Sequence, residues 1–396
     1  MRSLKYRELK RLYELEGAER TVHVLGDALK KGELKPEEFS IRELAEVTLG
    51  TSWVKQLDPR GGGGVDLMEA GDAVDVTAFS NITGQVIYNR IMLAYSQEAF
   101  ILSKLVDTIP TRFDGEKIPG IGRIVDETTE VRPGMPYPNL GLGEDYIETP
   151  STTKRGFIVP VTKEAIFFDR THLILQRAAE VGEILGLNKE KRLADLLIGQ
   201  TNNYNWKGTA YNTYYPAQDG APWVNALPGN ELVDWTNVDA AEQVFANILD
   251  PNTGEPVLVQ AATVLVTPAY HHAANRVFKA TEVWYRSNEE DPTTTTSPNP
   301  LGRYQVAESR LMYRRIIAAG QQPADAKKWW FIGDFKKAFA YMENWPITVT
   351  QSPLGSDADF NQDIVVRFKA SERGAAAVIN PRYIVKSTGA GSSSGQ

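Results

Sequence analysis

The sequence contains no cysteine and four histidines among its 396 residues. The absence of cysteine excludes disulfide bonds, thiolate catalysis and cysteine-ligated metal sites. The histidines are His23, His172, His271 and His272. The last two are adjacent, so on a helix they would diverge by about 100° and could not chelate one ion together. We therefore expect no metal, no cofactor and no catalytic residue, and a structural role for His271 and His272.

Long apolar runs and an excess of positive charge are also missing. No stretch of about 18 apolar residues is present, and the charged N-terminal segment lacks the apolar core of a signal peptide. The formal net charge is −7, which is the wrong sign for a protein that wraps nucleic acid through phosphate contacts. We expect a protein that is made in the cytoplasm and has no membrane partner.

Motifs of common enzyme and nucleotide sites are absent as well. There is no H-E-x-x-H pair, no EF-hand loop and no G-x-S-x-G elbow. The four glycines at 61–64 lack the Lys-Ser/Thr of a phosphate-binding loop, and Gly120 and Gly122 lack a third glycine at dinucleotide-binding spacing. These absences favour an architectural protein over an enzyme.

The most informative feature that is present lies at residues 111–200. The segments RFDGEKIPGIGRIVDETTEVR and IETPSTTKRGFIVPVTKEAIFFD read as the two legs of one hairpin. Legs of ~20 residues would span ~60 Å, whereas a compact chain of this length has a radius of gyration of ~21 Å. A lone two-stranded hairpin is marginally stable in water. We therefore expect the hairpin to lie on a second copy of the same chain.

Charged side chains of both signs follow the hairpin. Such residues suit complementary pairing between subunits, which contributes specificity more than affinity. The residues predicted to make these contacts are Arg112, Asp114, Glu116, Lys117, Arg123, Asp126, Glu127, Glu130 and Arg132.

The remaining chain predicts a mixture of helices and strands. A helix that could reach ~45 Å follows the hairpin at about 170–200. Residues 202–235 read as a long Tyr/Trp-rich loop. The other predicted elements are two N-terminal helices ending near 49, a helix at 238–250, a buried strand and helix at 261–280, an exposed loop at 291–302, strands within 327–352, and two strands around Gly374.

This order of elements resembles the major capsid protein of tailed bacteriophages, with its Hong Kong 97-like fold. The resemblance covers roughly residues 72–387. It lies in the order and the residue composition of the predicted elements, because the family has no diagnostic short motif. TVLVTPAYHHAANRVF is similar to the start of the family's A-domain. The closest local match is DFNQDIVVRFKASERGAAAVINPRYIVKS, in which the family's pattern is fitted by Phe360, Asn361, Glu372, Arg373, Pro381 and Tyr383.

The resemblance implies an α+β fold with the family's named parts. These would be an N-terminal helical segment (1–64), an N-arm (65–110), an extended E-loop hairpin (111–155), a P-domain (156–236 and 346–374) with a long spine helix at about 170–200, an A-domain (237–345 and 375–388) with a central sheet and flanking helices, and a flexible tail (389–396).

The implied function is that of a major capsid protein, or head protein. Such proteins self-assemble, as pentamers and hexamers, into an icosahedral shell that encloses the double-stranded DNA genome without sequence-specific binding. Portal protein is an implied partner, and some members also need scaffold and decoration proteins. The implied location is the virion, with assembly in the cytoplasm of the host bacterium.

Two other functions remain open from the sequence. An encapsulin-type bacterial nanocompartment shares the fold but packages protein cargo. A carbohydrate-binding or hydrolytic protein could use the aromatic loop, through Trp206, Trp223 and Trp235. Residues 1–64 are short for a scaffold that a protease removes, so we expect them to remain in a mature shell.

Overall fold

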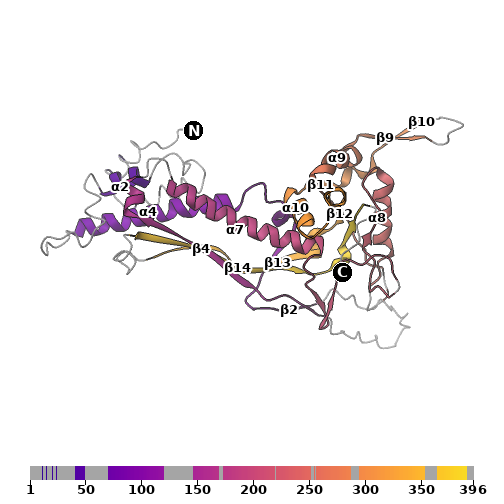
Figure 1. Ribbon diagram of the computed structural model, residues 1–396, viewed down its shortest axis with the longest axis horizontal. Helices are drawn as coiled ribbons and strands as arrows, with labels where there is room; N and C mark the ends of the chain where they lie inside the picture. Colours follow the sequence, from indigo (N-terminus) through magenta and orange to yellow (C-terminus); the bar gives the residue numbers. More distant parts are fainter. Residues whose placement is uncertain are drawn as a thin grey trace, which may run out of the picture. The chain divides into compact units, whose positions relative to one another are not determined.

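The computed structural model divides the chain into two compact units (Figure 1). Unit 1 contains residues 1–99, 154–188 and 345–373, and unit 2 contains residues 100–153, 189–344 and 374–396. The structure describes residues 41–49, 70–119, 146–168, 173–218, 220–250, 256–286, 294–352 and 364–389, with the isolated positions 11, 15, 20, 24 and 254.

Helices and strands are interspersed along the chain, which confirms the predicted α+β class. The helices are α2 (Ile41–Leu49), α4 (Ala70–Tyr95), α5 (Leu102–Leu105), α6 (Lys163–Phe167), α7 (Leu173–Ile198), α8 (Trp235–Asn247), α9 (His271–Lys279), α10 (Arg310–Ala318), α11 (Pro323–Ala326) and α12 (Phe335–Ala338). Short 3-10 turns are η2 (Pro268–Tyr270), η3 (Pro300–Arg303) and η4 (Pro381–Tyr383).

Within the described residues, the strands form four sheets, of which two have four strands and the others have five and two. Their orders are β1-β13-β14-β4, β11-β8-β12-β15-β7, β2-β3-β5-β6 and β10-β9. The strands are β1 (Asp107–Pro110), β2 (Lys117–Pro119), β3 (Tyr146–Glu148), β4 (Thr153–Thr162), β5 (Tyr204–Trp206), β6 (Thr209–Tyr211), β7 (Ala226–Leu227), β8 (Thr263–Val266), β9 (Glu282–Arg286), β10 (Thr294–Pro298), β11 (Gln305–Glu308), β12 (Trp330–Gly333), β13 (Phe339–Gln351), β14 (Ile364–Val378) and β15 (Ile384–Ser387).

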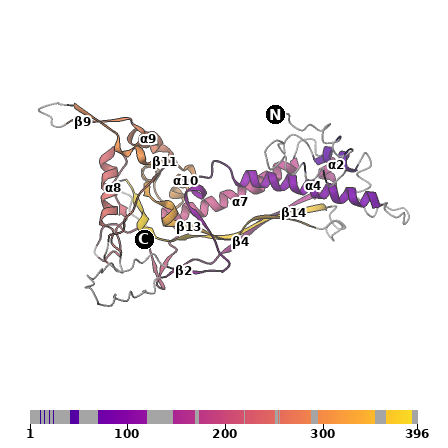
Figure 2. The ribbon, with the colours of Figure 1, turned by 180° about the vertical axis from the view of Figure 1, so that it is seen from behind.

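Unit 1 is a layer of helices on one face of a sheet. Helices α2, α4, α6 and the first part of α7 share one apolar cluster with β4, β13 and β14 (Figures 1 and 2). Val86 of α4 and Phe368 of β14 are among its buried members. Gly182 allows α4 and α7 to approach closely, because a Cβ there would lie 2.2 Å from the carbonyl oxygen of Ile91.

Unit 2 is organised around the five-stranded sheet. Its central strand β12 pairs antiparallel with β8 and with β15, and all four of its residues are buried. Helices α8, α9 and α10 contribute buried residues to the same cluster, as do residues from the last two turns of α7. Helix α8 begins with a capping box. The side chain of Asp234 accepts a hydrogen bond from the backbone of the first turn, and the side chain of Asn237 accepts one from the backbone N–H of Asp234. Residues next to the helix start therefore determine where it begins.

One ion pair and two hydrogen bonds to a buried carboxylate hold the C-terminal part of α7 within unit 2. Asp195 forms a bidentate ion pair with Arg315 of α10, at 2.6 and 2.7 Å. Glu190 is 2% exposed, and its two carboxylate oxygens accept hydrogen bonds from the backbone N–H groups of Leu102 (2.6 Å) and Ser103 (2.9 Å). These groups start helix α5, so Glu190 fixes that segment against α7.

Replacing Glu190 with Gln should destabilise unit 2 by about 1–3 kcal/mol, because the amide offers one acceptor oxygen and turns a donor toward a backbone N–H. Denaturant unfolding of the isolated subunit would measure the loss. Glu183→Gln, an exposed position on the same helix, serves as the control and should leave stability unchanged. Equal stability of both variants would contradict the assigned role of Glu190.

Three local predictions differ from the structure. Strand β14 runs without interruption through Gly374, where a turn between two strands was expected. A Cβ at Gly374 would lie 2.7 Å from the ring of Tyr341, so the glycine permits these two residues to pack closely.

The expected loop at 202–235 contains β5, β6 and β7, and β5 and β6 are joined by Lys207 and Gly208 at positive φ. The expected loop at 291–302 contains β10, because β-branched threonines favour a strand.

Candidate functional site

The base of the predicted hairpin is an antiparallel strand pair. Lys117, Ile118 and Pro119 of β2 pair with Glu148, Ile147 and Tyr146 of β3, respectively. Strand β3 also pairs with β5, so the pair belongs to a four-stranded sheet. Both legs of the hairpin therefore begin on a supported base, and residues 120–145 between them lie outside the described residues.

Three of the predicted contact residues hold this base together. The carboxylate of Asp114 accepts hydrogen bonds from the backbone N–H (2.7 Å) and the hydroxyl (3.1 Å) of Thr152. Glu116 accepts a hydrogen bond from the hydroxyl of Thr111 at 2.6 Å. Lys117 lies 3.4 Å from a carboxylate oxygen of Glu148 and 4.3 Å from the ring centre of Tyr146. The contacts of Asp114 and Lys117 tie the two legs to each other within one subunit, whereas that of Glu116 lies within the first leg.

The other predicted contact residues are placed differently. Arg112 is exposed beside the base. Arg123, Asp126, Glu127, Glu130 and Arg132 lie outside the described residues. Contact between subunits through the hairpin therefore stays a prediction.

The aromatic segment 202–235 is held in place by ring packing and by the hydrogen bonds of one buried asparagine. Trp223 is 5% exposed, and its ring lies 5.5 Å from that of Tyr204. Asn225 is fully buried; its amide nitrogen donates to the carbonyl oxygens of Thr213 and Pro381, both at 2.9 Å, and its amide oxygen accepts from the backbone N–H of Tyr215. The sequence did not indicate a structural role for Asn225, because a single asparagine in an aromatic loop does not show whether its side chain will be buried or which groups it will bind.

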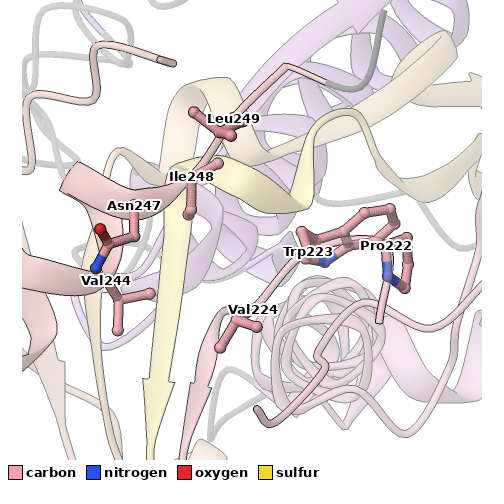
Figure 3. A pocket seen from close by; sticks show the side chains of 7 residues that line it. All are labelled: Pro222, Trp223, Val224, Val244, Asn247, Ile248 and Leu249. Carbon is pink, nitrogen blue, oxygen red and sulfur yellow. The ribbon is translucent and has the colours of Figure 1, made fainter. Parts of the chain in front are cut away.

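Trp223 also forms part of the wall of a pocket in unit 2 (Figure 3). The lining residues are Pro222, Trp223, Val224, Val244, Asn247, Ile248 and Leu249. These seven side chains include no carboxylate, hydroxyl or imidazole that could act as a general acid or base. The pocket therefore gives no support to the hydrolytic alternative.

His271 is held by neighbouring side chains. Its Nδ1 lies 3.1 Å from a carboxylate oxygen of Glu308, and its Nε2 lies 2.9 Å from the amide nitrogen of Asn275. Both ring nitrogens therefore lie beside other side chains of the protein, and the structural role of His271 stays a prediction. Among the described residues, no group of three or more His, Asp and Glu side chains is arranged to hold a metal ion, and no helix has the length and apolar character to cross a membrane.

The C-terminal end of α7 is closed by two side chains. The hydroxyl of Tyr214 donates to the carbonyl oxygen of Leu197 at 2.6 Å, and the Nζ of Lys386 donates to that of Ile198 at 3.1 Å. Lys386 is 8% exposed, and its Nζ lies 3.8 Å from the ring centre of Trp329. The ring and the carbonyl favour the ammonium form, but loss of hydration outweighs them and lowers the pKa of Lys386 to about 7.

This buried lysine should make stability depend on pH. The unfolded chain keeps the proton up to a pKa near 10.4, whereas the folded protein releases it above about pH 7. The unfolded state therefore binds more protons from about pH 7 to 10, and the free energy of unfolding should rise with pH by up to about 1.4 kcal/mol per unit. Denaturant unfolding at pH 7, 8 and 9 should show this rise in the wild type.

Lys386→Met is the matched comparison, because it keeps the length of the side chain and removes the amine. We expect the variant to be more stable at pH 7 and to lose most of the rise. The variant leaves the carbonyl of Ile198 without its donor, which subtracts about 1 kcal/mol at every pH and does not alter the slope. Parallel curves for the two proteins would contradict the lowered pKa.

Comparisons with known proteins identify the family of the sequence and solved structures to which the fold is similar. The sequence matches the family described as phage capsid protein over residues 146–387, more than half of the chain. No curated protein matches it. Similar solved structures include the capsid of a native GTA particle, at 12% identity and TM-score 0.44, covering 74% of this chain and 91% of that chain.

Two further structures are similar. The cyanophage Pam1 capsid has 11% identity and TM-score 0.45, covering 70% of this chain and 86% of that chain. The holo-SrpI encapsulin complex from Synechococcus elongatus has 10% identity and TM-score 0.42, covering 74% of this chain and 88% of that chain. The family assignment rests on the sequence match, which runs from the return leg of the hairpin to the end of β15.

Proposed function

This chain belongs to the phage capsid protein family, and on that premise we propose that it is the major capsid protein of a tailed bacteriophage. The protein is a structural component of the virion, and its copies associate into an icosahedral shell. We propose further that the shell is built from pentamers and hexamers and encloses double-stranded DNA. The observation that carries the proposal is the family match over residues 146–387.

The hairpin is the proposed element of contact between subunits. At its base, Asp114, Glu116 and Lys117 have partners within one chain. This supports the proposal that the base anchors the hairpin to its own subunit. The charged residues beyond the base would contact another copy; they are Arg123, Asp126, Glu127, Glu130 and Arg132. We retain the family's division into N-arm, E-loop, P-domain and A-domain, with the boundaries predicted from sequence, as part of this proposal.

Expression of the full chain and electron microscopy of the product would test the proposal. Closed particles of uniform size are expected, and disassembled particles should reassemble without any enzyme. A monodisperse species of about the subunit mass, 44.0 kDa, under all assembly conditions would contradict it. The nucleic acid and protein content of particles from the native source separates a phage shell from a nanocompartment, since the latter would contain a cargo protein in place of a genome.

Other proteins complete the proposed particle. A portal protein would occupy one vertex, and scaffold or decoration proteins would be needed if the chain alone yields shells of mixed size. Coexpression with neighbouring phage genes would reveal this dependence.

A further inference from the structure

Arg382 is a buried cation for which the described residues supply no counter-ion. It lies in η4 of unit 2 and is 6% exposed. Its Nε and Nη2 atoms are enclosed by protein and have no hydrogen-bond partner. No carboxylate in the described part of the chain forms an ion pair with it. Buried charges in proteins are normally paired and hydrogen-bonded, so this side chain needs an explanation.

Two indole rings are the neighbours of the guanidinium. Its Cζ lies 5.7 Å from the ring centre of Trp206 and 5.0 Å from that of Trp223. The face of an indole attracts a cation, but it accepts hydrogen bonds only weakly. Removing a charged group from water costs more than such contacts return. The rings therefore hold the guanidinium in place and leave its charge and its donors unmatched.

The side chain cannot escape this position by moving its backbone or by losing its proton. The backbone N–H of Arg382 donates to Oδ1 of Asn380 at 3.1 Å, and Nδ2 of Asn225 donates to the carbonyl oxygen of Pro381 at 2.9 Å. The buried amine of Lys386 can become neutral, since its pKa is lowered to about 7. An arginine side chain keeps its charge in proteins, so the missing negative charge must come from outside the chain.

The surroundings limit what can bring that charge. Nη1 is not among the enclosed nitrogens, so the guanidinium can be reached from this side. Trp206 is half-buried whereas Trp223 is 5% exposed, so the ring of Trp206 is the one that can yield to a ligand. An opening of this size admits a small ion and excludes a strand of nucleic acid or polypeptide. Lys207, whose Nζ lies 4.9 Å from the ring centre of Trp206, adds positive charge beside the same ring.

We infer that Arg382, with Trp206 and Trp223, forms a binding site for one small oxyanion of the size of inorganic phosphate. A guanidinium presents parallel N–H donors that match two oxygens of such an ion. The ion would supply the missing charge and accept hydrogen bonds from Nη1 and Nη2. The inference does not depend on the proposed function, because the whole site lies within one chain.

Thermal unfolding of the full chain in phosphate tests the site. Phosphate at increasing concentration, compared with chloride at equal ionic strength, should raise the midpoint of the wild type saturably by about 2–4 °C. Arg382→Met keeps an apolar stem and removes the unpaired charge, so it should fold and lose this rise. Arg276→Met, which removes an exposed cation of α9, is the matched control and should respond as the wild type does.

The variants also separate binding from the general effect of the salt. Phosphate stabilises many proteins because it is excluded from their surfaces, and that effect would appear equally in all three proteins. Equal rises in the wild type and in Arg382→Met would therefore overturn the site. The absence of any rise in the wild type would overturn it too, because ring contacts and water would then be sufficient for the guanidinium.

Tryptophan fluorescence of the wild type gives a readout that does not require Arg382→Met to fold. An ion beside the guanidinium alters the field at both indoles, so phosphate should change the emission with the same midpoint concentration as in thermal unfolding. Trp206→Phe should reduce that change. A flat titration would contradict the inference. A short oligonucleotide serves as the last comparison, and an Arg382-dependent response to it in place of phosphate would overturn the assignment to a small ion.

Discussion

Trp330→Ala should prevent the subunit from folding before assembly can be tested. Trp330 is fully buried in the central strand of the five-stranded sheet, and Phe331 and Ile332 beside it are fully buried as well. Truncating a buried aromatic side chain costs about 3–5 kcal/mol, a large share of the 5–15 kcal/mol that stabilises a typical domain. The expected result is aggregated protein, measured as the soluble fraction and as the denaturant midpoint of any soluble subunit.

The indole also makes a hydrogen bond, which a second variant separates from its volume. Trp330 Nε1 donates to the backbone carbonyl oxygen of Asn230 at 2.7 Å. Trp330→Phe keeps much of the ring but leaves that carbonyl without its donor, so we expect a smaller loss of about 1–3 kcal/mol and a folded subunit. If Trp330→Ala unfolded at the same midpoint as the wild type, the assignment of β12 to the core would be wrong.

Replacing residues 120–145 with Asn-Gly should abolish shell formation and leave the subunit folded. The last described pair of the hairpin base joins Pro119 to Tyr146, and Asn-Gly favours a two-residue turn between antiparallel strands. The contacts of Asp114, Glu116 and Lys117 would remain in place. Size-exclusion chromatography and electron microscopy should find soluble subunits without particles, with a thermal midpoint close to that of the wild type.

A Gly/Ser linker of the original length provides the control for this replacement. It preserves chain length and removes the charges and apolar residues, so it should also fail to assemble if side chains make the contact. Normal particles from both variants would show that residues 120–145 are dispensable. A large fall in thermal midpoint would show instead that the segment stabilises its own subunit.

Elements bounded by strong local signals could be predicted from the sequence. The apolar run at Thr263–Val266 is followed by Pro268 and then by amphipathic residues, and the structure has β8, η2 and α9 there. The helix expected at about 170–200 is α7, and the buried strand expected near Trp330 is β12. In each case the periodicity or the proline determines the local conformation, whatever the surrounding fold is.

Features that depend on distant neighbours could not be predicted. Gly374 lies in a continuous strand because the ring of Tyr341 packs directly against it, and the sequence alone makes an Arg-Gly pair look like a turn. Asp114 and Glu116 were predicted to contact another subunit, which stays a prediction, and the sequence did not indicate their partners within the chain, Thr152 and Thr111. A charged residue in a hairpin carries no signal of which threonine it will meet.

The construction of unit 1 from three distant segments has a consequence for synthesis on the ribosome. Val86 and Ile91 of α4 are fully buried against a cluster that includes Val366 and Phe368 of β14, and β14 is translated long after α4. At about 5–20 residues per second, the apolar stripe of α4 waits roughly 15–55 s for its partner strand. During that time the face of α4 that will contact β14 stays exposed on the nascent chain, although α2, β4, α6 and α7 are translated earlier and belong to the same cluster. We therefore expect the soluble yield of this protein to rise when a chaperone that binds nascent chains is coexpressed.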